Sequence, residues 1–179
     1  MRQYNFKITV IGDVGVGKTS LINQFILKKF QKDYVSTIGV NILLKDINIK
    51  LKDDPTKYEC QLMFWDVGGQ EKFNNVRHMF YKGTNGAIVV YDTTRPATFL
   101  KVPDFLQDLE ITIQAKVPFI LLGNKNDLKD MRHVERENGE KLGATSNAIA
   151  FFESSAKIGA NVEESFRLIA EACLKNALK

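Results

Sequence analysis

The feature that most constrains the fold is a glycine-rich segment, Gly12-Asp13-Val14-Gly15-Val16-Gly17-Lys18-Thr19, which fits the pattern G-x-x-x-x-G-K-S/T. It directly follows the apolar run FKITVIG at 6–12 and opens an amphipathic stretch near 18–28. Glycines in such a loop let backbone N–H groups converge on phosphate oxygens at the positive end of a helix. Because a chance match in this context is rare, the sequence predicts an α/β fold built around a phosphate-binding loop.

Beyond this loop, apolar runs of strand length alternate with longer amphipathic stretches. The further runs lie at 40–51, 57–67, 86–92, 117–123 and 148–152. This alternation favours a mainly parallel sheet with helices on both faces. The polar turn at 53–55 between two alternating strands predicts one antiparallel hairpin, whose lysine-bearing part near 45–57 should form a solvated edge. We therefore expect six strands, one of them antiparallel.

The last segment has apolar side chains at helical spacing, which predicts a final helix packed on the sheet. The residues of this stripe are Val162, Phe166, Ile169, Ala170, Cys173 and Ala177. Cys173 is therefore expected in the core and not as a lipidation site.

Length and composition exclude several other classes of protein. With 179 residues the chain fits one domain, 1–179. Its two cysteines, Cys60 and Cys173, indicate neither a disulfide framework nor a zinc site, which favours a reducing, cytoplasmic setting. The net charge of +4 is spread without a basic block, so nucleic-acid binding is not expected. No apolar run is long enough to span a bilayer, and no signal peptide is evident.

The phosphate-binding loop assigns chemistry to two side chains. Lys18 should reach the β- and γ-phosphates, and Thr19 should give its hydroxyl to Mg²⁺, which prefers oxygen ligands. This loop alone leaves ATP and GTP as alternatives.

The tetrapeptide Asn124-Lys125-Asn126-Asp127 supplies the choice of base. It follows the run at 117–123, at the strand end where an open parallel sheet places its ligand. The Asp127 carboxylate can accept hydrogen bonds from N1–H and the exocyclic amine of guanine, and adenine presents neither donor there. Standing alone, N-K-x-D is more often a polar turn, but after a phosphate-binding loop it indicates guanine binding.

Glu153-Ser154-Ser155-Ala156-Lys157 follows the last strand, and here the chain resembles the Ras superfamily, closest in pattern to its Rab-like members. Alone, this segment would be interpreted as a Ser-rich loop that caps a helix. The resemblance covers nearly the whole chain with the motifs in family order. It implies a P-loop NTPase fold, the G domain, in which Ser155-Ala156-Lys157 contacts the guanine.

The resemblance extends through the two switch segments of the family. In switch I, Phe30 lies where an aromatic packs on guanine, Tyr34 where a tyrosine closes over the phosphates, and Thr37 where a threonine completes the Mg²⁺ shell only with GTP.

In switch II, Asp66 holds the metal through water, the Gly69 N–H contacts the γ-phosphate, and Gln70 positions the attacking water.

Together these assignments give the expected site. Catalytic roles fall to Lys18 and Gln70, and metal contacts to Thr19, Thr37 and Asp66. The nucleotide-binding residues are Asp13, Val14, Gly15, Val16, Gly17, Lys18, Thr19, Ser20, Phe30, Tyr34, Thr37, Gly69, Asn124, Lys125, Asp127, Ser155, Ala156 and Lys157.

Three features depart from the usual Rab pattern. Gly68-Gly69 is similar to Arf and heterotrimeric α-subunit sequences, so the subfamily stays open. The separation from Thr37 to Asp66 is longer than usual in Rab proteins. Val14 stands where Ras has glycine, and its branched side chain should crowd the γ-phosphate side and slow hydrolysis.

The resemblance also implies protein partners. Effectors, exchange factors and GTPase-activating proteins should bind through residues 34–42 and 65–81 of a monomer. Ile42, Trp65 and Phe80 match an effector patch, with burial of all three in the core as the alternative. Because switch I lacks an internal arginine, fast turnover should require a partner's arginine.

The expected function is a GTP/GDP switch with slow intrinsic hydrolysis, in membrane traffic or signalling. A GTP-binding scaffold with little hydrolysis is the alternative, and an ATP-dependent P-loop kinase would leave Asn124 to Asp127 unexplained. Because the sequence ends at Leu178-Lys179 without a prenylation motif, membrane attachment is expected only through a tail not present in it.

Overall fold

The fold was analysed in a computed structural model, which describes residues 2–30, 37–52, 54–69 and 74–179. The strands are β1 (Arg2–Gly12), β2 (Val40–Lys50), β3 (Lys57–Val67), β4 (Gly86–Asp92), β5 (Phe119–Asn124) and β6 (Ala150–Glu153). The helices are α1 (Lys18–Leu27), α2 (Asn74–Tyr81), α3 (Pro96–Leu100), α4 (Val102–Ile113), α5 (Arg136–Thr145) and α6 (Val162–Ala177), with a 3-10 turn at Lys129–Met131.

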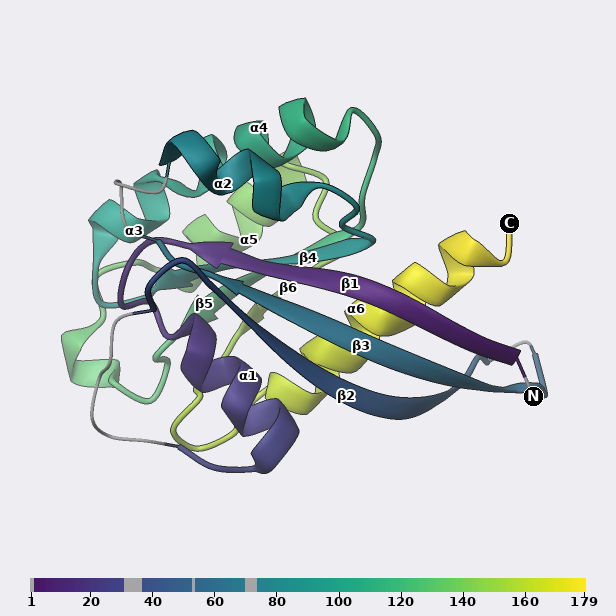
Figure 1. The fold of residues 1–179 in the computed structure, drawn as a ribbon. Coiled ribbons are helices and arrows are strands. Elements are labelled where there is room, and N and C mark those ends of the chain that lie inside the picture. The colour runs from purple at the N-terminus through teal and green to yellow at the C-terminus, as the bar shows by residue number, and fades with distance from the viewer. Residues whose placement is uncertain (1, 31–36, 53, 70–73) are drawn as a thin grey trace.

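The six strands form one sheet in the order β2-β3-β1-β4-β5-β6. Only β2 and β3 pair antiparallel, from Val40 opposite Val67 to Lys50 opposite Lys57; the other neighbours are parallel. The expectation of six strands with one antiparallel is confirmed. β1 and the β2–β3 hairpin extend far past β4, β5 and β6 (Figure 1). β2 lies at one edge of the sheet, with several exposed side chains.

Helices cover both faces of the sheet, as Figure 1 shows, with α1 and α6 on one face and α2 to α5 on the other. The first face buries Phe25 of α1 and Phe166 of α6, whose ring centroids are 4.9 Å apart, with Phe64 of β3 beside both. The second face buries Phe105 and Leu109 of α4 against Val89 and Leu121. β4 is buried along its whole length because it lies between these two layers.

The final helix differs from its expected stripe at one position. Cys173 is buried, and burial raises the pKa of its thiol to about 12, as expected for a core cysteine. Ala177 is exposed, so its expected place in the stripe is wrong, and Leu174 is fully buried instead. Ala177 is the last residue of α6. No helix among the described residues has the length and apolar character needed to cross a membrane.

Candidate nucleotide site

The phosphate-binding loop joins the carboxyl end of β1 to the start of α1, as the sequence predicts. Gly17, with φ of 100°, directly precedes the helix, and a Cβ atom at Gly17 would lie 2.3 Å from Nδ2 of Asn124. Only glycine permits both this left-handed backbone and this close approach. The phosphate loop is therefore in direct contact with Asn124, the first residue of the segment 124–127 that is expected to recognise the base and is called the base-recognition segment below.

Lys18 lies almost fully buried inside this loop. Its Nζ donates hydrogen bonds to the carbonyl oxygens of Gly12 (2.8 Å) and Asp13 (2.7 Å). Burial lowers the pKa of Lys18 to about 8, although the carboxylates of Asp66 and Asp13 oppose this shift. Both hydrogen-bond acceptors of this ammonium group are neutral carbonyls. Phosphate oxygens would give it negatively charged acceptors and stronger hydrogen bonds.

Three oxygen-bearing side chains meet beside Lys18. The Thr19 and Thr37 hydroxyls lie 2.9 Å apart, and both donate to Oδ2 of Asp66, Thr37 at 3.4 Å. Oδ1 of Asp66 is buried and has no hydrogen-bond partner among the described residues. Burial raises the pKa of Asp66 despite the hydrogen bonds from both threonines. This oxygen set and its orphaned carboxylate oxygen fit a hard cation such as Mg²⁺.

The two segments expected to recognise the base also come together, at the ends of β5 and β6. Asn124 Nδ2 donates to the Val16 carbonyl (2.8 Å), and its Oδ1 accepts from the Ala156 N–H (3.2 Å). Ser155 Oγ donates to Oδ1 of Asp127 (2.6 Å). Asn124, the first residue of the segment 124–127, thus contacts both the phosphate loop and the segment 153–157.

An ion pair that sequence reasoning missed supports these two segments. Glu153 is buried and accepts from both terminal nitrogens of Arg132, at 2.5 and 3.0 Å. Arg132 also donates to Oδ1 of Asn126 (2.9 Å), and its bond to Glu153 raises the pKa of the guanidinium. A bidentate contact of this kind fixes orientation as well as distance. No motif marks this pairing, because it joins Glu153 to an arginine 21 positions away in the sequence.

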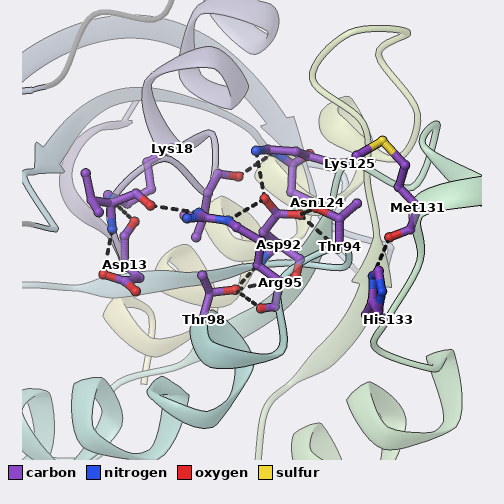
Figure 2. Close-up of polar contacts among 12 residues, drawn as sticks. Asp13, Lys18, Asp92, Thr94, Arg95, Thr98, Asn124, Lys125, Met131 and His133 are labelled. Carbon is purple, nitrogen blue, oxygen red and sulfur yellow. Dashed lines mark hydrogen bonds and ion pairs between the residues drawn. The ribbon is translucent and has the colours of Figure 1, made fainter.

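A second group missed by sequence reasoning surrounds Asp92 at the end of β4, in the centre of Figure 2. Its fully buried carboxylate forms ion pairs with Nζ of Lys125 (2.7 Å) and Nε of Arg95 (3.0 Å). It also accepts hydrogen bonds from the backbone N–H and the hydroxyl of Thr94. Burial alone would raise the pKa of Asp92, but the hydrogen bonds from Lys125 and Thr94 outweigh it and lower the pKa. The available signal was an acid at the last position of an otherwise apolar strand.

The two glycines of switch II, Gly68 and Gly69, lie against switch I and the phosphate loop, respectively. The Gly68 N–H donates to the Gly39 carbonyl (2.8 Å), joining the two switch segments. A Cβ atom on Gly69 would lie 2.5 Å from backbone atoms of Gly12, Asp13 and Val14. Any side chain at Gly69 would therefore displace switch II from the phosphate loop.

The remaining predicted site residues differ in their placement. Ser155 and Ala156 are buried, Gly15 and Ser20 are partly buried, and Lys157 is exposed. The side chains of Val14 and Phe30 are 36% and 39% exposed, at the surface of the site. Tyr34 and Gln70 lie outside the described residues.

The three side chains of the proposed effector patch are exposed or only partly buried, although Phe80 packs against the second face of the core. Ile42 is 47% exposed, and it pairs across the hairpin with the half-buried Trp65. Phe80 is also half-buried, and Nζ of Lys7 lies 3.5 Å from the centre of the Trp65 ring. Full burial of these side chains, the alternative considered from sequence, is wrong.

Comparison with known proteins finds relatives along nearly the whole chain. The sequence model of a family described as the Ras family matches residues 7–175. The Ras-related protein Rab-13 of Rattus norvegicus is 38% identical over 169 residues, covering 94% of this chain and 80% of that protein. Rab-8B of Homo sapiens is 38% identical over 167 residues (93% and 77%), and Rab-10 of Caenorhabditis elegans is 37% identical over 169 residues (94% and 81%).

Proposed function

From the premise that this chain belongs to the Ras family, as a Rab-like small GTPase, we propose that the residues above hold its guanine nucleotide and Mg²⁺. Members of this family bind GTP and GDP and hydrolyse GTP to GDP, and this chain is such a molecular switch in membrane traffic. The observation that most supports the assignment of residues is the contact of Asn124 with Val16, which joins the base-recognition segment to the phosphate loop.

Phosphate binding is assigned to the loop and to Lys18. Backbone N–H groups of residues 14–19 lie at the start of α1, where the helix dipole favours negative charge. Lys18 would exchange its carbonyl partners for the β- and γ-phosphates. The purine is assigned to Asn124, Lys125, Asp127, Ser155, Ala156 and Lys157, with Phe30 and Tyr34 at its edge.

Mg²⁺ is assigned to Thr19 and Thr37 directly and to Asp66 through water. Oδ1 of Asp66 supports this assignment: it finds no donor in the part of the chain that the structure describes, and a buried carboxylate oxygen without a donor is costly unless a cation is near. When bound, the metal neutralises charge on the phosphates.

Hydrolysis is assigned to in-line attack of a water molecule held by Gln70, with Lys18 stabilising charge that develops on the phosphate oxygens. Loss of the γ-phosphate would release Thr37 and Gly69, so both switch segments would relax together. The contact between Gly68 and Gly39 supports such coupling.

Partners of the family, effectors and regulators, are assigned to residues 34–42 and 65–81, including Ile42, Trp65 and Phe80. Exposed apolar side chains in this region, Ile38, Ile42, Val76 and Met79, support the assignment. We propose that the chain acts as one G-domain monomer, and that it reaches membranes peripherally through a lipidated tail, as Rab proteins do.

Replacing Asp127 with Ala tests the assignment of the base. The carboxylate would accept two hydrogen bonds from guanine, so Asp127→Ala should weaken GDP binding by at least about a hundredfold. The measurement is a titration with fluorescent GDP and ADP in the presence of Mg²⁺. Asp130→Ala, at an exposed acid three residues away, is the matched control and should leave GDP affinity unchanged. Equal affinity of the unmodified protein for GDP and ADP would refute guanine selectivity.

A further inference from the structure

Arg95, in the turn between β4 and α3, joins two parts of the nucleotide site that the sequence motifs treat separately. Its Nη2 donates to the Val14 carbonyl of the phosphate loop (2.8 Å), while its Nε donates to Oδ2 of Asp92 (3.0 Å). Figure 2 shows the Arg95 side chain extended between these two acceptors.

Asp92 also contacts the base-recognition segment, residues 124–127. The same Oδ2 atom accepts Nζ of Lys125 at 2.7 Å, and Lys125 belongs to the Asn124–Asp127 tetrapeptide. The backbone is tied in the same way, since the Thr93 N–H donates to the Asn124 carbonyl (3.0 Å). A continuous series of contacts therefore runs from Val14 through Arg95 and Asp92 to Lys125.

The turn that carries Arg95 is itself held firmly. Thr98 Oγ donates to the Arg95 carbonyl (2.8 Å) and accepts from the Asp92 N–H (2.9 Å), and the Arg95 N–H donates to the Asp92 carbonyl (3.0 Å). Thr98 is fully buried. Six residues after Arg95, Lys101 lies 3.2 Å from the Asp13 carboxylate, so the same segment contacts the phosphate loop twice.

The chemistry of this position requires a guanidinium group. Its donors form a rigid fork that can reach a carbonyl on one side and a carboxylate on the other, whereas the single nitrogen of lysine engages such separated acceptors poorly. Arg95 is also partly exposed, with 43% of its side chain accessible, so it is not needed to fill the core.

On the basis of the function proposed above, we propose that Arg95 is a positioning residue that fixes the phosphate loop relative to the guanine-recognition segment, so that phosphates and base bind jointly. The contact ties the backbone of Val14, at the γ-phosphate side of the loop, to an acid anchored on Lys125. Removing the Arg95 side chain should weaken binding of the phosphates more than binding of the base.

Comparing GDP with GMP separates the two contributions, because GMP keeps the base and lacks the β-phosphate. For Arg95→Ala, the affinity for GDP should fall about tenfold, the effect of losing one charge-assisted hydrogen bond, while the affinity for GMP changes less than twofold. Affinities are measured by competition against fluorescent GDP. Arg95→Lys should behave like Arg95→Ala, and Arg167→Ala, at an exposed arginine paired with Glu163, should match the unmodified protein.

A double-substitution cycle tests the connection through Asp92. Arg95→Ala and Lys125→Ala should combine to less than the product of their separate effects on GDP affinity, because both act through one carboxylate. The pair Arg167→Ala and Lys125→Ala should combine to the full product.

Three results would overturn the proposal: an equal loss for GDP and GMP, full recovery of GDP affinity by Arg95→Lys, or independent effects of Arg95 and Lys125. Failure of the proposed function has a different signature, since the unmodified protein would then bind ADP as well as GDP.

Discussion

At the scale of single residues, the buried Lys18 makes nucleotide binding depend on pH. Its pKa of about 8 in the nucleotide-free protein is well below the usual 10.5, so neutral Lys18 becomes the main form above pH 8. Phosphates beside it favour the charged form, so binding above pH 8 requires proton uptake. GDP affinity should therefore fall between about pH 8 and 10, by up to tenfold per pH unit.

Calorimetric titration of GDP at pH 8.5, in two buffers that differ in ionisation enthalpy, measures this uptake directly. Lys18→Met should take up no proton at this position. The nucleotide-free protein should itself gain stability from pH 8 to 10.5, because over this range its unfolded form holds the Lys18 proton that the folded form has lost. Binding without proton uptake in the unmodified protein would contradict the buried, depressed state of Lys18.

Val14 is the residue expected to tune the rate of hydrolysis. Its side chain is 36% exposed beside the phosphate loop, where it would crowd Gln70 and an incoming arginine. Val14→Gly should speed single-turnover GTP hydrolysis, by up to about a hundredfold with an activating partner and less alone, with little change in GDP affinity. Equal rates for both proteins, with and without the partner, would show that the loop accommodates the valine.

Sequence reasoning found the site residues that belong to contiguous motifs and missed those that act singly. Asn124, Asp127 and Ser155 follow strands in recognisable segments, and the structure brings them together. Arg95 and Arg132 stand alone in the chain. Their roles come from contacts with Val14 and Glu153, which only the parallel order of β1, β4, β5 and β6 brings within reach.

At the scale of elements, the two switch segments should respond together to the nucleotide. The Gly68 N–H bonds to the Gly39 carbonyl, and Thr37 contacts both Thr19 and Asp66. We expect peptides covering residues 31–41 and 66–72 to be more protected from hydrogen exchange with a non-hydrolysable GTP analogue than with GDP. A peptide covering β4, buried along its length, should be unchanged and serves as the control. Equal protection of the switch peptides in both states would argue against a switch.

The sequence patterns predicted which segments form strands, but they did not predict where several strands and helices begin and end. β3, β4 and the antiparallel hairpin matched the apolar runs, because these strands alternate cleanly or are wholly buried. β1 begins at Arg2, four residues earlier than its apolar run, because pairing of Arg2 to Asn5 with β3 extends the strand through polar residues. Of the helices, the sequence patterns predicted a position only for the one near 18–28 and the final one, so the bounds of α2 to α5 stayed open. α3 is short, and α5 buries only two glycines, Gly139 and Gly143, so neither carries a strong apolar pattern.

At the scale of the whole molecule, nucleotide should act as a stabilising ligand, because the site draws on loops from both halves of the sheet. At about a thousand times its dissociation constant, GDP with Mg²⁺ should add about 4 kcal/mol to the free energy of unfolding. For a domain of this size that corresponds to a rise in melting temperature of about 10 °C. Thermal denaturation with GDP, with ADP and after chelation of Mg²⁺ measures it. A rise as large with ADP as with GDP would contradict the assignment of the base.

On the proposed assignment of the base, the contacts of Ser155 and Ala156 with Asp127 and Asn124 would also set the point in synthesis at which the protein can first bind nucleotide. A ribosome adds residues one at a time, at about 5–20 per second, and the phosphate loop emerges long before β6. Until the segment after β6 has been translated, the early loop has no completed base pocket beside it. A chain that ends before residue 157 would therefore carry the phosphate loop and still fail to hold GTP. Bound nucleotide would then distinguish nearly complete chains from those whose translation stopped early.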